Sequence, residues 1–187
     1  MYGMINRAVK GLVVDRYGAE TWERIRVLAK VDEVEFLSME QYPDELTYRL
    51  VAASSEVLGV PADQVLQAFG EYWIEYTAEA GYGEIMRAAG RSLPEFLANL
   101  DQLHTRIRFG MPQLRPPSFS VTEAEDGTLL LRYVSEREGL APLVVGLVKG
   151  LARKFGESAE VELVAPRTKD RPFDEFRIVR TAIVGTA

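Results

Sequence analysis

The sequence predicts an α+β fold, in which a helical part in residues 1–110 precedes a four-stranded antiparallel sheet that carries one helix in residues 111–187. Three observations predict this fold. Apolar residues recur every three or four positions through the first part, which is the helical period. After Pro116 and Pro117 they fall in short runs bounded by turn residues, which is typical of strands. One stretch, 140–155, then returns to the helical period.

Six helices are predicted in the first part. Gly18 and Gly90 each end one of them, since glycine readily takes the conformation that stops a helix. Pro61 opens another, because proline suits the first helical turn. Asp44 is a candidate N-cap for the helix that follows it. The predicted ranges are 6–17, 21–30, 44–57, 62–78, 82–89 and 92–109.

The last of these helices carries the only histidine of the chain. Ser92 and Glu95 match a capping box, in which each side chain bonds a backbone N–H of the other's turn. Apolar residues follow at spacings of three and four. His104 lies four residues after Leu100 and three before Ile107, so it belongs to the inward-facing stripe of the helix.

The second part is expected to form four strands and one helix. Proline at Pro112, Pro116 and Pro117 disfavours helix and predicts an extended stretch before the first strand. The later pattern predicts two strands joined by an acidic turn with glycine, then a helix, then two strands joined by a charged turn. In order, the ranges are strands 118–122 and 128–135, helix 140–155, and strands 158–165 and 173–184.

Composition narrows the class of protein. The 187 residues are 47% apolar and 27% charged, and no linker or repeat divides them, so residues 1–187 are expected to form one domain with the two parts as subdomains. A net charge of −6 argues against a nucleic-acid partner. No 18-residue apolar run and no secretory leader is recognised, which predicts a cytoplasmic protein without a membrane span. The absence of cysteine fits a reducing compartment.

A single histidine and no cysteine limit the metal chemistry that one chain can perform. Two-histidine sites, Cys/His zinc sites and thiol nucleophiles are excluded. One imidazole can still hold an iron whose other ligands come from a porphyrin. Taken alone, however, a histidine on an apolar helix face is more often an ordinary core residue than a ligand, so His104 needs support from elsewhere in the sequence.

A second candidate group lies on the second predicted strand. Alternate residues of a strand share one face, so Tyr133, Ser135 and Arg137 point the same way. They offer hydroxyl donors and one fixed positive charge, a set that suits one or two carboxylates. The same three residue types are also common on an exposed strand face, and spacing alone leaves both interpretations open.

Together these residues match a known family. The chain resembles the heme-nitric oxide/oxygen binding (H-NOX) domains, relatives of the heme domain of soluble guanylate cyclase, over essentially its whole length. The Tyr-x-Ser-x-Arg motif after the histidine is specific to that family. Further matching segments are Met1–Gly3 with Asn6, Tyr48, Gly70–Trp73, Gly81–Gly83, Leu93–Phe96, Asn99–His104 and Pro112–Pro117.

The resemblance implies a heme b group bound between the two subdomains. His104 would be the proximal ligand to the heme iron, and Tyr133, Ser135 and Arg137 would bind the heme propionates. Pro117 matches a proline that presses on the porphyrin and bends it in the family. Its rigid ring, set beside a flat cofactor, would act as a wedge.

The resemblance also indicates which residues would face the gas. Ile5 matches an apolar position that packs on the heme. Oxygen-binding members tend to carry a tyrosine on the helix after the motif, and the matching residue here is Pro142, which has no side-chain donor. Leu143 and Leu147 beside it are apolar, and Trp73 stands where oxygen binders tend to carry a smaller polar residue. The indole of Trp73, or the hydroxyl groups of Tyr2 and Tyr72, remain possible donors to a bound gas.

These residues predict a sensor of nitric oxide that also binds carbon monoxide, excludes oxygen and is not itself an enzyme. Signalling would follow when nitric oxide weakens the bond between iron and His104 and the porphyrin relaxes. The family implies a separate partner, often a histidine kinase or a cyclic-dinucleotide enzyme. A heme enzyme, an oxygen-binding heme protein and a heme-free module that kept the fold remain alternatives, although peroxidase chemistry would lack its usual distal histidine.

Overall fold

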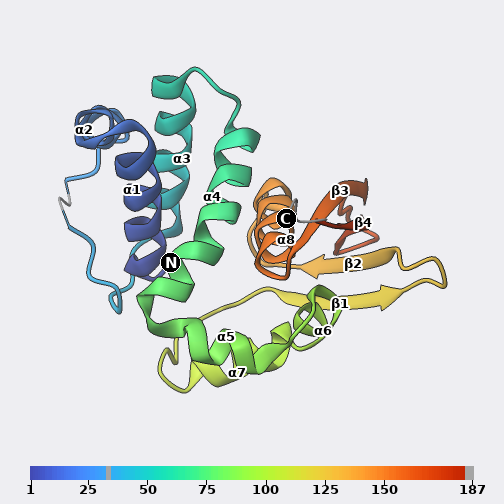
Figure 1. Cartoon of the computed structure of the whole chain (residues 1–187). Coiled ribbons are helices and arrows are strands. Elements are labelled where there is room, and N and C mark those ends of the chain that lie inside the picture. The colour runs from blue at the N-terminus through green and yellow to red at the C-terminus, as the bar shows by residue number, and fades with distance from the viewer. Residues whose placement is uncertain (33–34, 184–187) are drawn as a thin grey trace.

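The computed structural model describes residues 1–32 and 35–183. The first four helices of the chain form one group. The four helices predicted for 6–17, 21–30, 44–57 and 62–78 are confirmed, with ends shifted by a few residues. Gly18 and Gly59, with φ of 86° and 66°, terminate two of them in a conformation that favours glycine. This group consists of α1 (Gly3–Tyr17), α2 (Ala19–Leu28), α3 (Asp44–Leu58) and α4 (Ala62–Thr77) (Figure 1).

The next three helices lie beyond a kink at the end of α4. A π-helical turn, η1 (Ala78–Tyr82), has Gly81 at φ 94° and leads into α5 (Gly83–Ala89). The single helix predicted for 92–109 is wrong, because two helices occupy that stretch: α6 (Leu93–Ala98) and α7 (Leu100–Arg108).

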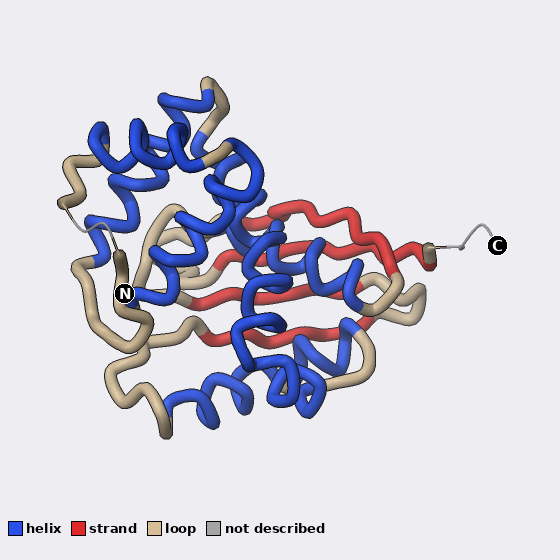
Figure 2. The backbone as a smooth tube through the Cα atoms, turned by 60° about the vertical axis from the view of Figure 1, so that its left-hand side comes forward, coloured by secondary structure: helices blue, strands red, loops and turns tan. Residues whose placement is uncertain are grey.

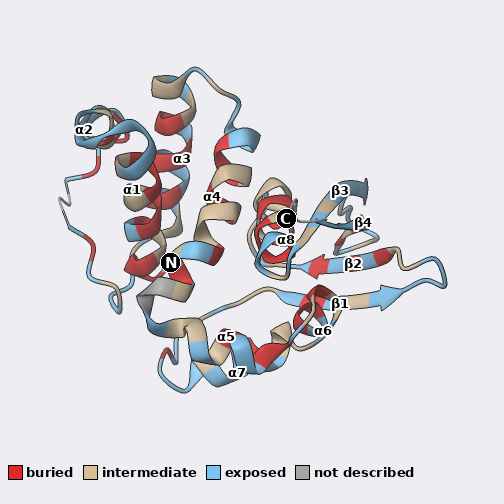
Figure 3. Cartoon of the chain, in the orientation of Figure 1, coloured by how far each residue is buried: buried red, intermediate tan, exposed pale blue. Residues whose placement is uncertain are grey.

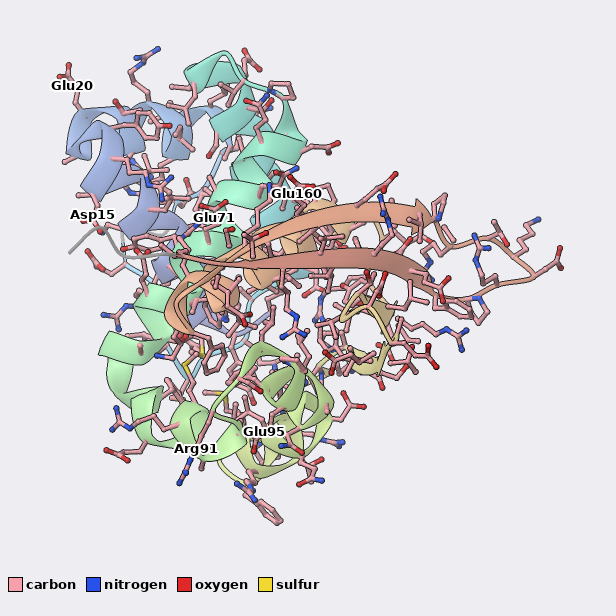
Figure 4. The ribbon with its side chains drawn as sticks, turned by 45° about the vertical axis from the view of Figure 1, so that its right-hand side comes forward. Asp15, Glu20, Glu71, Arg91, Glu95 and Glu160 are labelled. Atoms are coloured by element: carbon pink, nitrogen blue, oxygen red, sulfur yellow. The ribbon has the colours of Figure 1, made fainter. Side chains whose placement is uncertain are left out.

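Asn99 causes the break between α6 and α7. Its backbone leaves helical geometry at φ −97° and ψ 3°, and its side-chain amide donates to the carbonyl of Ala89 at 2.9 Å. An asparagine can trade helix bonds for such a contact. At the other end of α6 the Ser92 hydroxyl accepts from the Glu95 N–H, as predicted, whereas the Glu95 carboxylate accepts from the N–H of Arg91 (Figure 4).

The second part of the chain contains the predicted sheet. All neighbouring strands are antiparallel, in the order β1-β2-β4-β3. The end of the last predicted strand, at 184, lies outside the described residues. The elements are β1 (Ser118–Glu123), β2 (Leu129–Val134), α8 (Ala141–Lys154), β3 (Glu157–Ala165) and β4 (Asp174–Ala182).

One face of the sheet is buried beneath helices. Residues of β2 alternate strictly between buried and exposed, as expected for a strand with one covered face (Figure 3). The side chains of Leu131, Phe176 and Ile178 are fully buried and share a core with Val144 and Val148 of α8. The four strands lie side by side, with helices crossing one side of them (Figure 2).

Helices α4 and α8 join the helical group to the sheet through a close backbone contact. A Cβ atom on Gly146 would lie 2.0 Å from the carbonyl oxygen of Gln67, and one on Gly70 would lie 2.3 Å from that of Leu143. Only glycine permits such an approach. The crossing therefore sets the distance between the two parts. Within the described residues, no helix combines the length and apolarity needed to cross a bilayer.

Candidate functional site

A large cavity lies between the helical group and the sheet. Its volume is about 1280 Å³, above the usual range of roughly 300–1,000 Å³ for small-molecule sites. Residues from α1, α3, α4, α7, β2 and α8 line it, so neither part of the chain forms it alone. All nine residues predicted for the site line this cavity: Ile5, Trp73, His104, Pro117, Tyr133, Ser135, Arg137, Leu143 and Leu147.

His104 occupies one wall of the cavity, on α7. Its ring centroid lies 6.2 Å from that of Phe119 on β1. Burial lowers the pKa of His104 below the usual 6.5, although the carboxylate of Asp101 and the backbone of Pro117 act in the opposite direction. Its Nδ1 atom is buried without a hydrogen-bond partner. Burial thus favours the neutral imidazole, which is the form that binds a metal.

Tyr133 and Ser135 stand at the end of β2. Tyr133 is only 3% exposed, and burial raises the pKa of its hydroxyl, with the Ser135 hydroxyl acting in the opposite direction and Asp174 adding to the rise. The Ser135 hydroxyl accepts from the backbone N–H of Arg137 at 3.1 Å. The structure therefore brings the three residues of the motif together, although only Tyr133 lies within the strand itself.

Arg137 is held by groups from both halves of the chain. Its Nε donates to Asp44 at 2.7 Å and its Nη1 to the carbonyl of Arg115 at 2.9 Å. The N-terminal amine of Met1 bonds the same Asp44 carboxylate at 2.6 Å. Burial would raise the pKa of Asp44, but the bonds from the amine and from Arg137 outweigh it and hold the pKa below its usual value.

Asp44 is a site residue that the sequence did not reveal. The sequence predicts it as an N-cap, but Pro43 takes that position, and the Asp44 side chain makes ion pairs with Arg137 and the Met1 amine. An aspartate at the start of a helix is usually an N-cap, so the local sequence gives no sign of a second role for Asp44. Only the folded chain brings Asp44 next to Arg137, which lies 93 residues away.

The wall formed by α1, α4 and α8 is apolar. Ile5, Leu143 and Leu147 contribute hydrocarbon side chains. The ring of Trp73 stacks on that of Tyr76 and meets that of Phe69 edge-on, both on α4. Pro142 is not among the residues that line the cavity. The apolar character of this wall therefore rests on its neighbours Leu143 and Leu147.

Two tyrosines considered as donors into this wall behave differently. The hydroxyl of Tyr72 donates to Asp15 at 2.7 Å, and Tyr72 does not line the cavity. Tyr2 does line it, and its hydroxyl accepts from the backbone N–H of Gln113 at 3.3 Å. Of these two tyrosines, Tyr2 borders the cavity and Tyr72 does not.

Asp101 links the helix of His104 to the sheet. Its carboxylate accepts from the Ser118 hydroxyl at 2.5 Å and from the Phe119 N–H at 2.9 Å. Asp101 lies one turn before His104 on α7, and the strand β1 that it grips begins directly after Pro117. The sequence contains no signal for this contact beyond the helical spacing of Asp101 and His104.

The donor set of the cavity defines what it can hold. An imidazole from α7, hydroxyl groups and a guanidinium from the end of β2, and hydrocarbon side chains from α1 and α8 all line it. These groups fit a large apolar molecule that carries carboxylates and a metal able to accept an imidazole. The heme expected from the sequence has these properties.

Comparison with known proteins gives a consistent result. The family model described as haem-NO-binding matches residues 2–163. The curated protein named soluble guanylate cyclase gcy-35, from Caenorhabditis elegans, is 36% identical over 179 residues, covering 94% of this chain and 26% of the relative. Soluble guanylate cyclase gcy-32 of the same organism is 37% identical over 172 residues, covering 90% and 25%. The chain thus spans about a quarter of the length of these relatives.

Solved structures share the fold. An H-NOX protein from S. oneidensis in the Fe(II)NO ligation state superposes with a TM-score of 0.86 at 18% identity, covering 97% of this chain and 99% of that one. The Fe(II) unliganded H-NOX protein from K. algicida superposes with a TM-score of 0.81 at 23% identity over the full length of both chains.

Proposed function

The chain belongs to the haem-NO-binding family of heme-binding gas-sensor domains, and we propose that it senses nitric oxide at a ferrous heme b while excluding oxygen. The observation that carries the proposal is one cavity lined by an imidazole, by carboxylate-binding groups and by the hydrocarbon side chains of Ile5, Leu143 and Leu147. In this proposal residues 1–110 and 111–187 are two subdomains of one sensor domain, with the heme between them.

The residues present fit a heme. His104 would supply the only protein ligand to the iron, because its imidazole borders the cavity and the sequence contains no other histidine and no cysteine. Tyr133, Ser135 and Arg137 would hold the propionates through two hydroxyl groups and a guanidinium. The backbone of Pro117 lies close to the ring of His104, so its pyrrolidine would meet the porphyrin on the same side.

The apolar wall supports selectivity for nitric oxide over oxygen. Bound oxygen carries partial negative charge and is stabilised by a hydrogen-bond donor in a dry pocket. Leu143, Leu147 and Ile5 provide no such donor, and the hydroxyl of Tyr72 is turned to Asp15. Nitric oxide and carbon monoxide depend less on such a donor, so both would bind in this pocket.

The contacts around His104 supply a route for the signal. His104 would hold the heme iron, and the binding of a gas to the heme would weaken that hold. Release of His104 would free α7 to move, and Asp101 would transmit that movement to β1 through Ser118 and Phe119. Pro117, directly before β1, would then relax from the porphyrin. Two arrangements biased by a ligand constitute a switch.

The output of the switch would lie in a signalling effector. The curated relatives are named guanylate cyclases and are about four times longer than this chain, so catalytic parts of those proteins lie outside the matched region. We propose that this domain has no enzymatic activity of its own and regulates a partner, either a cyclase, a histidine kinase or a cyclic-dinucleotide enzyme, in the cytoplasm.

An absorption spectrum of the heme-loaded, reduced protein tests the proposed function. The Soret band should shift when nitric oxide or carbon monoxide is added and should show no persistent oxygen complex in air. A stable oxygen complex would establish the oxygen-binding alternative. Rapid turnover of added peroxide would instead establish a heme enzyme, and a protein that stays colourless with heme supplied would be a heme-free module.

A further inference from the structure

The turn between β3 and β4 reaches the segment that follows β2. Arg167, in this turn, donates from its Nη1 to the carbonyl oxygen of Ser135 at 2.9 Å and to that of Arg137 at 3.3 Å. Its backbone N–H donates to the carboxylate of Asp174 at 2.8 Å. Arg167 is half-buried and binds the backbone of both Ser135 and Arg137. It does so from a part of the chain that the sequence predicts only as a charged turn.

We propose that Arg167 is a positioning residue that holds Ser135 and Arg137 in place to bind the heme propionates. The inference rests on the proposed function of the cavity. Arg167 does not line the cavity, so it would act through the two residues that it holds and would not touch the heme. A guanidinium on a carbonyl makes a charge-assisted bond, which is stronger than a bond between neutral groups.

The need for such support follows from where β2 ends. The strand stops at Val134, so Ser135 and Arg137 lack the ladder bonds that hold Tyr133. On the cavity side, Arg137 is bonded to Asp44 and to the carbonyl of Arg115. A propionate would compete with Asp44 for that guanidinium. Arg167 binds backbone carbonyls and not the guanidinium of Arg137, so its contacts remain when Arg137 changes its partner.

Arg167 is also connected to the third member of the motif. Asp174, which its backbone N–H holds, lies opposite Tyr133 in the register of β2 and β4. Asp174 is only 6% exposed, and it is close enough to Tyr133 to contribute to the raised pKa of that hydroxyl. All three residues that would bind the propionates are therefore linked to Arg167, two directly and one through Asp174.

The test is the rate at which the heme-loaded full chain gives up heme to excess apomyoglobin. Arg167→Met removes the guanidinium and keeps an apolar stem, and we expect about tenfold faster heme loss, the effect of losing one charge-assisted hydrogen bond. Arg167→Lys keeps a charged donor and should give an intermediate rate. Arg171→Met is the matched control, because the Arg171 guanidinium binds the carbonyl of Pro166 within the same turn. It should lose heme at the wild-type rate.

A second measurement separates positioning from general loss of stability. In the heme-free protein, Arg167→Met should accelerate hydrogen–deuterium exchange of the amides in 135–137, and Arg171→Met should leave them unchanged. Faster exchange without faster heme loss would overturn the proposal, as would an unchanged heme-loss rate in a folded Arg167→Met protein.

Arg137→Ala, measured in parallel, distinguishes this inference from the proposed function. If Arg137→Ala loses heme quickly and Arg167→Met does not, only the role of Arg167 is wrong. If Arg137→Ala retains heme like the wild type, the propionate site itself is wrong. If the wild-type protein binds no heme, the proposed function fails, and a role for Arg167 in propionate binding fails with it.

Discussion

The two walls of the cavity are built in different ways. On the side of α4 and α8, backbones touch at Gly70 and Gly146, where a Cβ would lie 2.3 Å and 2.0 Å from neighbouring carbonyl oxygens. On the side of α7, the helix has one buried side chain, Leu103, and Asp101 bonds it to Ser118 and Phe119 of β1. One wall is determined by shape and the other by individual side chains.

This difference indicates which wall can move. Packed backbones have no alternative arrangement without a large loss of contact, whereas a helix with one buried side chain and two hydrogen bonds to the sheet can be displaced at a smaller cost. His104 lies on the tethered helix, and the apolar residues Leu143 and Leu147 lie on the packed side. A gas would thus bind against the rigid wall, and the response would occur in the other.

The largest effect is expected from His104→Gly. If His104 is the only protein ligand to the iron, the purified variant should hold essentially no heme, and added imidazole should restore it by occupying the vacated space. The ratio of Soret to protein absorbance measures heme content. Gln102→Gly, an exposed position on the same helix, controls for glycine in α7, which costs about 1 kcal/mol. Wild-type heme content in His104→Gly would show that His104 of α7 is not the ligand to the heme iron.

A smaller but substantial effect is expected at the rigid wall. Gly146→Ala would place a Cβ 2.0 Å from the carbonyl oxygen of Gln67, so α4 and α8 would have to separate. We expect the free energy of unfolding to fall by about 3 kcal/mol. Urea denaturation of the heme-free protein measures it. Gly110→Ala, whose nearest new contact is 3.8 Å away, should change it by less than about 0.5 kcal/mol. Equal stability of the two variants would contradict a wall determined by shape.

The sequence predicted the residues of both walls better than it predicted the contacts between them. The apolar stripe of the helix with His104 and the alternation in β2 follow local periods, so both were readable. The break at Asn99 was not, because it depends on the carbonyl of Ala89, ten residues earlier. Gly70 and Gly146 could not be recognised as a contact either, since nothing local distinguishes a glycine that meets another helix from one that does not.

In the candidate site, too, local spacing was predictable and long-range contacts were not. Spacing predicts that Tyr133, Ser135 and Arg137 share a strand face, but β2 ends at Val134, so only Tyr133 lies in the strand, although all three line the cavity. Asp44 and Arg167 reach the same point from 93 and 30 residues away in the chain, so only folding reveals them. A charged residue is common at the start of a helix and in a surface turn, so the sequence gives no reason to expect a second role for Asp44 or Arg167.

Asp101→Asn tests the contact between α7 and β1. The amide retains one acceptor but loses the charge that binds Ser118 and Phe119, so the free energy of unfolding should fall by about 1 kcal/mol. The signalling response should change more than the stability, since α7 would no longer pull on β1. Denaturation and the spectral change on nitric oxide binding measure the two effects. Glu160→Gln, at an exposed position on β3 (Figure 4), should alter neither.

The smallest effect is a dependence of stability on pH that originates at His104. Burial lowers the pKa of His104 in the folded, heme-free protein below 6.5, so the unfolded chain binds the proton more readily. The stability associated with neutral His104 is therefore fully present above pH 6.5 and is lost as the pH falls through the lowered pKa. Asp44, whose pKa is lowered from 3.8, contributes in a more acidic range. His104→Gln should flatten the stability profile as the pH falls below 6.5. Because the chain has no other histidine, an unchanged slope in that variant would mean that the imidazole is not buried against the movable wall.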